Sequence, residues 1–225
     1  YTTLFRSLRK AGVRYHLIGG QSFFDRREIR DFLAYLKTFI NPHDDISLLR
    51  IANTPARGLS DVTMERLLAA SQERHCSVFA AMKNPMVAVE FQKRTQESIE
   101  AFVEFIERTR AELHNEMVKQ EATVLPAWAD RFLDETGYLA ELRRSEKDAE
   151  TGEARVRNLR ELIATLDGYN PVGKLGFERL ETSLEDITLD YDREDEEKDK
   201  GAVVTLITLH SCKGLEFPRV FIVGL

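Results

Sequence analysis

The stretch Val203–Leu225, VVTLITLHSCKGLEFPRVFIVGL, decides how this chain is interpreted. Two almost continuously apolar runs, Val203–Leu209 and Val220–Val223, flank a polar loop. Such runs are typical of strands that are buried on both faces of a parallel sheet. The earlier segment Arg14–Ile18 has the alternation of a short strand. We therefore expect these three runs to share one parallel sheet.

The chain between Ile18 and Val203 is predicted to be mostly helical. Its apolar residues recur at three- and four-residue spacing, and the turn Asn53–Ser60 interrupts this pattern. Pro85 is expected to open the longest helix, and the acidic run Asp190–Lys200 is expected to be an exposed linker. The predicted fold class is mainly α with a partial α/β domain, in which a helical insertion separates two segments that contribute to a parallel sheet. The apolar stripes predict helices around residues 21–39, 99–117, 125–133, 156–166 and 177–187.

Composition describes an ordinary soluble protein of 225 residues, with 43% hydrophobic and 31% charged residues. No apolar run approaches the roughly 20 residues that a membrane-spanning helix needs, so no membrane partner is expected. Cys76 and Cys212 are too few for a disulfide framework or a zinc site. The chain is therefore expected in a reducing cytoplasm.

Charge is distributed unevenly along the chain, although the net charge is only −6. Residues 1–60 carry ten Lys/Arg against five Asp/Glu, which is net +5, and residues 178–199 carry eleven acids against three bases, which is net −8. A basic region beside an acidic one is compatible with one DNA-facing surface and one solvated surface. It is equally compatible with two solvated surfaces.

The polar loop Thr208–Phe217 follows the carboxyl end of a predicted strand, where α/β sheets bind their ligands. It combines hydroxyls, an imidazole, an ammonium, a glycine and a carboxylate. Hydroxyls, backbone N–H groups and Lys213 are suited to phosphate oxygens, and Glu216 can accept a hydrogen bond from a ribose hydroxyl. The alternative is a polar turn between buried strands, with His210 bonded to the backbone.

Three segments of the chain resemble motifs of the UvrD/Rep/PcrA group of superfamily 1 DNA helicases. The segment TLITLHSCKGLEFPRVFIVGL, residues 205–225, resembles helicase motif V of this group. Tyr15–Asp31, YHLIGGQSFFDRREIRD, and Asn41–Ser60, NPHDDISLLRIANTPARGLS, resemble two further segments, and the three stand in the family's order. The resemblance implies that residues 1–40 and 201–225 are parts of a RecA-like motor domain, 2A. It likewise implies that residues 41–189 are a helical insertion, 2B, and that residues 190–200 are an acidic linker.

The resemblance further implies the activity and sites of a longer parent protein, of which this chain is expected to be an internal piece. That parent is an ATP-dependent 3′–5′ DNA helicase that unwinds duplexes in repair or replication, with ATP and Mg²⁺ as cofactors. Glu216 and Gly214 are implied at the ATP site. Contacts to single-stranded DNA are implied for Thr208, His210, Ser211 and Lys213.

The turn that ends at Ser60 is the predicted duplex contact. Backbone N–H groups at a helix start can approach a phosphate, and small residues permit that approach. Ser60 is expected to cap the next helix, although the family usually has glycine there. A simple capped turn is the alternative. The duplex contacts implied by the resemblance are Thr54, Arg57, Gly58, Leu59 and Ser60, with Arg57 as a salt-sensitive phosphate contact.

No G-x-x-x-x-G-K-[ST] phosphate loop occurs in the sequence, so no catalytic set is complete and no metal site is expected. The chain alone is predicted to hydrolyse no ATP and to bind no cofactor tightly. Its predicted partners are single-stranded DNA, duplex junctions and repair or replication proteins, in the bacterial nucleoid. Two alternatives stay open: a non-enzymatic DNA- or protein-binding regulatory module, and a subunit of a helicase–nuclease.

Overall fold

The computed structural model describes residues 8, 11, 13, 15–18, 23–118, 124–146, 148–168, 174–196, 204–207 and 212–223. The chain forms two compact units. The first combines Tyr1–Asp25 with Thr188–Leu225, and the second is Arg26–Ile187. We call these the strand unit and the helical unit.

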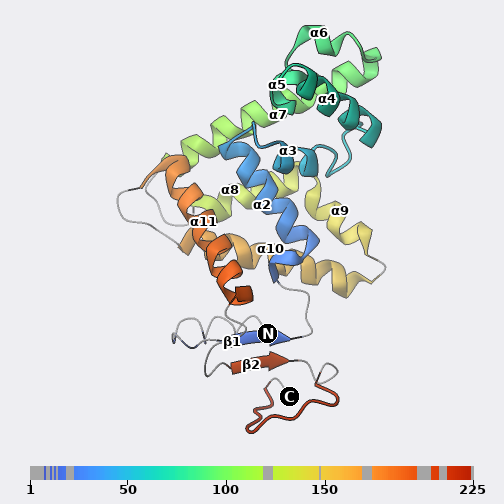
Figure 1. Ribbon diagram of the computed structural model, residues 1–225. Coiled ribbons are helices and arrows are strands. Elements are labelled where there is room, and N and C mark those ends of the chain that lie inside the picture. The colour runs from blue at the N-terminus through green and yellow to red at the C-terminus, as the bar shows by residue number, and fades with distance from the viewer. Residues whose placement is uncertain are drawn as a thin grey trace. The chain divides into compact units, whose positions relative to one another are not determined.

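The strand unit contains β1 (Tyr15–Ile18) and β2 (Val204–Ile207), which pair in parallel with Tyr15 opposite Val204 and Ile18 opposite Ile207. Figure 1 shows the two strands side by side. A parallel pair needs a long connection between its strands, and the helical unit lies within that connection. The chain is mainly helical, as predicted, and the two strands on either side of the helical segment pair in parallel.

The third predicted strand, Val220–Val223, is wrong. These residues form no strand, and their side chains are 58–85% exposed. A strand persists only where a neighbour accepts its backbone hydrogen bonds, and among the described residues β1 and β2 pair only with each other. Continuous hydrophobicity alone therefore did not identify a strand here.

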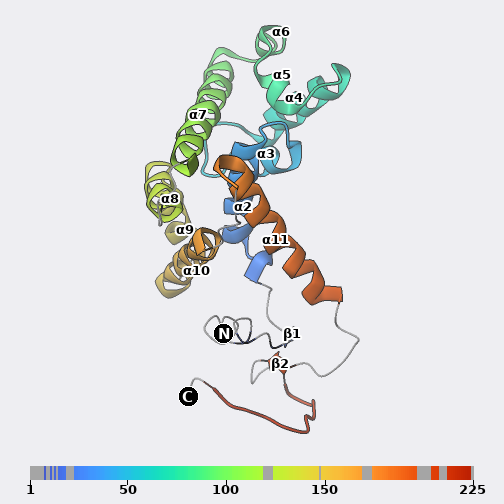
Figure 2. The ribbon, with the colours of Figure 1, turned by 90° about the vertical axis from the view of Figure 1, so that its left-hand side faces the viewer.

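The helical unit consists of short and long helices that are joined by short connecting segments (Figures 1 and 2). The helix α2 lies in its middle and packs on α3, α7 and α10, and α4, α5 and α6 gather at one end. The elements are η1 (Phe23–Asp25, in the strand unit), α2 (Arg27–Ile40), α3 (Asp45–Ile51), α4 (Asp61–Glu73), α5 (Val78–Met82), α6 (Pro85–Ala88), α7 (Lys93–Val118), α8 (Val124–Glu135), α9 (Tyr138–Ser145), α10 (Ala149–Gly168) and α11 (Gly176–Glu196), the last of which extends past Ile187.

Aromatic side chains from α2, α7 and α8 form the core of the helical unit. Phe132 of α8 contacts Tyr35 with ring centroids 5.0 Å apart and stacks on Trp128 at 5.0 Å. Phe39 of α2 meets the same two α8 rings edge-on. Edge-to-face and offset contacts of this kind stabilise a core beyond the area that they bury. Phe105 of α7 contacts Tyr35, Phe39 and Phe132, so the three helices share one aromatic core.

Two buried carboxylates tie α2 to distant parts of the chain. Asp31 accepts a hydrogen bond from Tyr138 of α9 at 2.9 Å and forms an ion pair with Arg50 of α3 at 2.7 Å. Glu28 accepts a hydrogen bond from Asn158 of α10 at 2.8 Å. A buried carboxylate is tolerated only when it is paired in this way, so these contacts fix α2 within the unit.

Three sequence boundaries differ from the structure. The expected boundary at residue 40 lies at Arg26 instead, because the apolar face of α2 is buried in the helical unit. The predicted linker at 190–200 continues α11 as helix to Glu196, since propagating a helix adds a hydrogen bond for each residue that it orders. Pro85 opens the short α6, and the longest helix begins only at Lys93.

Candidate nucleic-acid interface

The turn Asn53–Ser60 connects α3 to α4 and has a backbone that few sequences adopt. The Thr54–Pro55 peptide is cis, and Gly58 has a φ of +78°. A Cβ at Gly58 would lie 2.9 Å from Oγ of Ser98 on α7. Glycine is therefore required here both by its conformation and by the close approach of α7.

Leu59 and Ser60 anchor the end of this turn. The Leu59 side chain is fully buried, so it fixes the turn to the core. Ser60 is the N-cap of α4, and its Oγ accepts a hydrogen bond from the Thr63 N–H at 3.3 Å. The result is an exposed helix start, with Ser60, Asp61 and Val62 at the surface. Unsatisfied N–H groups at such a helix start attract anions, although the Asp61 carboxylate opposes that attraction.

The Arg57 side chain, predicted as a salt-sensitive phosphate contact, forms hydrogen bonds within the turn and to α2. Its Nη1 donates to the backbone carbonyls of Ile51, Thr54 and Pro55 at 3.0, 2.9 and 3.2 Å. Its Nη2 donates to the Tyr35 hydroxyl at 2.6 Å. A carbonyl oxygen can accept two hydrogen bonds, and the guanidinium supplies a further donor to these carbonyls at the end of α3 and in the turn. Arg57 is thus a structural part of the turn.

The Tyr35 hydroxyl links this turn to α2. It accepts from Arg57 and donates to the carbonyl of Thr54. Burial raises the pKa of the Tyr35 phenol from 10.0 to about 12, against the opposing effect of the Arg57 guanidinium. The phenol therefore stays protonated and keeps its role as a donor.

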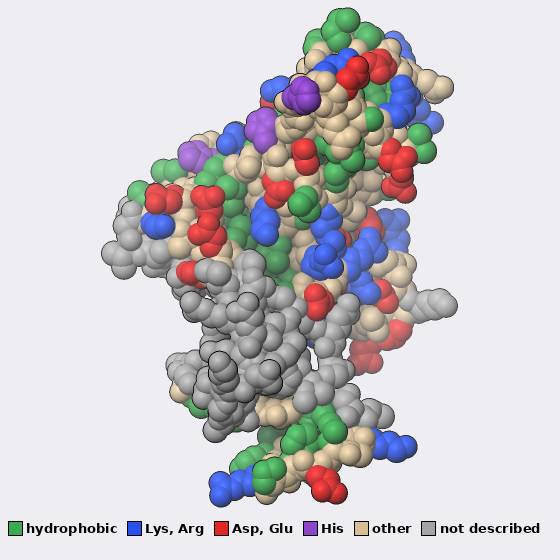
Figure 3. Space-filling model, viewed as in Figure 1, with side chains coloured by type: hydrophobic (Ala, Val, Ile, Leu, Met, Phe, Trp, Pro, Cys, Tyr) green, Lys and Arg blue, Asp and Glu red, His purple; other side chains and the backbone are tan. Residues whose placement is uncertain are grey.

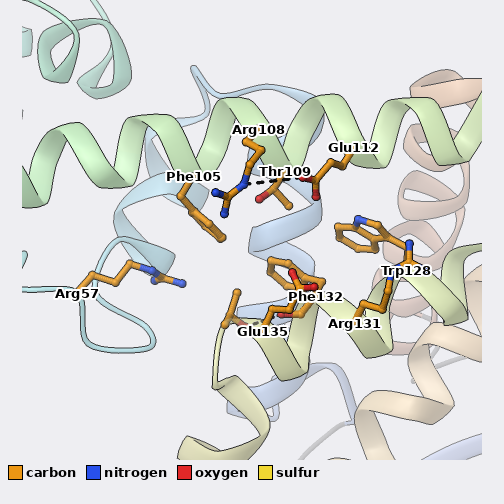
Figure 4. A pocket seen from close by; sticks show the side chains of 10 residues that line it. Arg57, Phe105, Arg108, Thr109, Glu112, Trp128, Arg131, Phe132 and Glu135 are labelled. Atoms are coloured by element: carbon orange, nitrogen blue, oxygen red, sulfur yellow. Dashed lines mark hydrogen bonds and ion pairs between the residues drawn. The ribbon is translucent and has the colours of Figure 1, made fainter.

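A pocket of about 300 Å³ lies between α7, α8 and the turn (Figure 4). Phe105, Trp128 and Phe132 form its aromatic wall, and Arg57 lies at one end. The Arg57 guanidinium is 4.8 Å from the centre of the Phe105 ring, a cation–π distance. The charged residues that line the pocket are of both signs: Arg57, Arg108 and Arg131 are basic, and Glu112 and Glu135 are acidic.

Exposed cations follow one face of α2. Arg27, Arg30 and Lys37 are all exposed there. On the face drawn in Figure 3, Lys and Arg side chains gather over the middle of the helical unit, where α2 lies. Arg27 is partly neutralised by Glu141 at 3.2 Å. Some of the basic residues of segment 1–60 therefore lie on this exposed face of α2.

The predicted nucleotide and single-strand residues belong to the strand unit, and the structure describes only some of them. Lys213, Gly214 and Glu216 lie in or just after a turn at Cys212–Gly214, and all three are exposed. Gly214 has a φ of +86°, and the Leu215 N–H donates to the Cys212 carbonyl at 3.0 Å. Thr208, His210 and Ser211 lie outside the described residues. Their predicted roles stay predictions.

Among the described residues, no group of three or more His, Cys, Asp or Glu is arranged to hold a metal ion. In the same part of the chain, no helix combines the length and apolarity needed to cross a membrane.

A family model described as "UvrD-like helicase C-terminal domain" matches residues 2–225. The chain belongs to this family. An ATP-dependent DNA helicase PcrA of Staphylococcus epidermidis is 36% identical over 216 residues, which cover 96% of this chain and 28% of the relative. The protein of the same name from Bacillus subtilis is 32% identical over 224 residues, covering 97% and 29%. This UvrD-like helicase C-terminal domain therefore spans less than a third of the length of the curated relatives that it matches.

The sequence did not reveal the residues of other helices that contact the turn Asn53–Ser60 and fix its conformation. Tyr35 is hidden in an apolar stripe, and no local pattern indicates that it meets Arg57, 22 residues away. Ser98 lies in the longest helix and limits the size of residue 58. The UvrD-like helicase C-terminal domain thus positions its surface turn through contacts that only the fold reveals.

Proposed function

We propose that this chain is the DNA-contacting and regulatory part of an ATP-dependent DNA helicase, and that its turn at Asn53–Ser60 binds the phosphate backbone of duplex DNA. The observation that carries the proposal is the geometry of this turn. It combines Gly58 at positive φ, a buried Leu59 and an exposed start of α4. Backbone N–H groups displayed in this way are suited to a phosphate oxygen.

The basic face of α2 supports the same proposal. Arg27, Arg30 and Lys37 are exposed, and cations along a surface follow a phosphate backbone without reading its sequence. The proposed ligand is therefore a duplex, or a junction of duplex and single strand, with no sequence preference. The relatives are named as DNA helicases, which agrees with such a ligand.

In the strand unit we propose that Glu216 and Gly214 contribute to an ATP site and that Lys213, with Thr208, His210 and Ser211, contacts single-stranded DNA. The exposed carboxylate of Glu216 suits a ribose hydroxyl. ATP and Mg²⁺ would supply the phosphoryl-transfer chemistry in the longer protein. We propose that the parent translocates 3′ to 5′ in the bacterial nucleoid, that β1 and β2 belong to its RecA-like domain 2A, and that the helical unit is 2B.

Fluorescence anisotropy tests the duplex contact. A labelled duplex with a 3′ single-stranded tail and a single strand of equal length are titrated with the chain at several salt concentrations. We expect the junction to bind more tightly, with log K falling linearly against log salt. Equal affinity for the two DNAs would refute the proposed duplex contact.

A further inference from the structure

The carbonyls of the turn Asn53–Ser60 converge on one side chain. Ile51, Thr54 and Pro55 all direct their carbonyl oxygens at Nη1 of Arg57. In a planar trans peptide, the C=O and the following N–H point in opposite directions. The peptide that turns the Pro55 carbonyl toward Arg57 therefore turns the N–H of Ala56, an exposed residue, away from it.

The opposite side of the Arg57 guanidinium is held by the core. Its Nη2 bonds to the hydroxyl of Tyr35 on α2, and its carbon lies 4.8 Å from the ring centre of Phe105 on α7. Tyr35 itself packs against Phe132 of α8. The guanidinium thus ties a surface turn to α2 and α7, and Tyr35 extends the link to α8.

We propose that Arg57 is the positioning residue of the duplex-binding turn: it holds the turn carbonyls inward so that the Ala56 N–H faces the DNA, and it does not itself touch a phosphate. This inference rests on the proposed duplex contact and specifies how that contact is built. A planar fork of donors that also stacks on a ring is a property of arginine alone. Lysine keeps the charge but cannot reproduce this set of contacts.

The substitution Arg57→Lys separates positioning from direct charge contact. Positioning predicts that Arg57→Lys weakens junction binding roughly tenfold, as expected for the loss of hydrogen bonds to a charged group, while the salt slope stays unchanged. A direct phosphate contact predicts that Arg57→Lys binds like the wild type and that Arg57→Gln lowers the salt slope by about one. The matched control is Arg108→Lys. Arg108 lines the same pocket but is ion-paired with Glu112 at 3.8 Å, so this substitution should change neither quantity.

Tyr35→Phe provides a second test at a buried residue that meets no DNA. It removes the hydroxyl bonded to Arg57 and to Thr54 but keeps the ring in the core. We expect weaker junction binding, with no further loss when Arg57→Lys is added, because both changes release the same turn. Losses that simply add would overturn the inference. The buried Trp128 reports by its fluorescence that each variant is folded.

The outcomes distinguish this inference from the function on which it rests. If the wild type does not prefer the junction, the proposed duplex contact fails. If the wild type prefers the junction but folded Arg57→Lys binds it equally well, only the positioning role of Arg57 fails.

Discussion

Replacing Gly58 by alanine should destabilise the helical unit by about 1.5–3.5 kcal/mol. The φ of +78° costs an L-residue roughly 1–2 kcal/mol. The new Cβ would lie 2.9 Å from Ser98 Oγ, and this hydroxyl donates to the Arg94 carbonyl at 3.1 Å. Turning the hydroxyl away loses that hydrogen bond, which contributes about 0.5–1.5 kcal/mol.

Gly137 provides the matched control. Its φ is +72°, but a Cβ added there would meet nothing within 4 Å. Gly137→Ala should therefore show only the conformational cost of about 1–2 kcal/mol. The effect of alanine on the unfolded chain is the same at both sites and cancels in the comparison.

Urea denaturation followed by Trp128 fluorescence measures both variants. Trp128 is the sole tryptophan of the chain and is 3% exposed within the helical unit, so its signal reports that unit. In a Ser98→Ala background, the cost of Gly58→Ala should fall to that of Gly137→Ala. Equal costs in the wild-type background, or an excess that persists without the Ser98 hydroxyl, would refute the close-contact reasoning.

Two further predictions concern pH and the α4 cap. Burial raises the pKa of Tyr35 from 10.0 to about 12. The contribution of the Tyr35 phenol to the free energy of unfolding is therefore complete below pH 10 and is lost as the pH rises toward 12. The loss reaches up to about 2.7 kcal/mol for two pKa units. Burial also raises the pKa of Tyr138. The free energy of unfolding, measured from pH 9 to 12, should therefore still fall in Tyr35→Phe, but less steeply than in the wild type. Identical slopes in the two proteins would contradict this prediction. Ser60→Gly should cost only a few tenths of a kcal/mol and should tighten junction binding in the anisotropy assay, because it removes a side chain from the phosphate approach. Weaker junction binding by folded Ser60→Gly would count against that approach.

The repeating patterns of the sequence predicted most of the helical unit. Apolar residues at helical spacing correctly located α8 and α10, with Gly137 at positive φ after the former. Periodicity succeeds there because one buried face per helix is enough to specify the element. It failed at Val220–Val223 because a strand depends on a partner that local sequence does not reveal.

The turn was predicted in outline and corrected in detail. Small residues in the turn were expected to permit a close approach, and Gly58 has a positive φ there. Leu59, predicted as a duplex contact, has a fully buried side chain. The sequence did not indicate that Arg57 bonds inward, because the acceptors and ring that hold it come from the turn's own carbonyls and from distant Tyr35 and Phe105. The phosphate contact predicted for Arg57 stays a prediction.

An amide-resolved NMR titration of the ¹⁵N-labelled chain with a short duplex is the most direct test of the central claim. If backbone N–H groups of the turn hold a phosphate, the largest shifts should occur at the amides of residues 56–63, and those of α10 should stay unchanged. Shifts confined to other surfaces, with residues 56–63 unaffected at saturating duplex, would contradict the account.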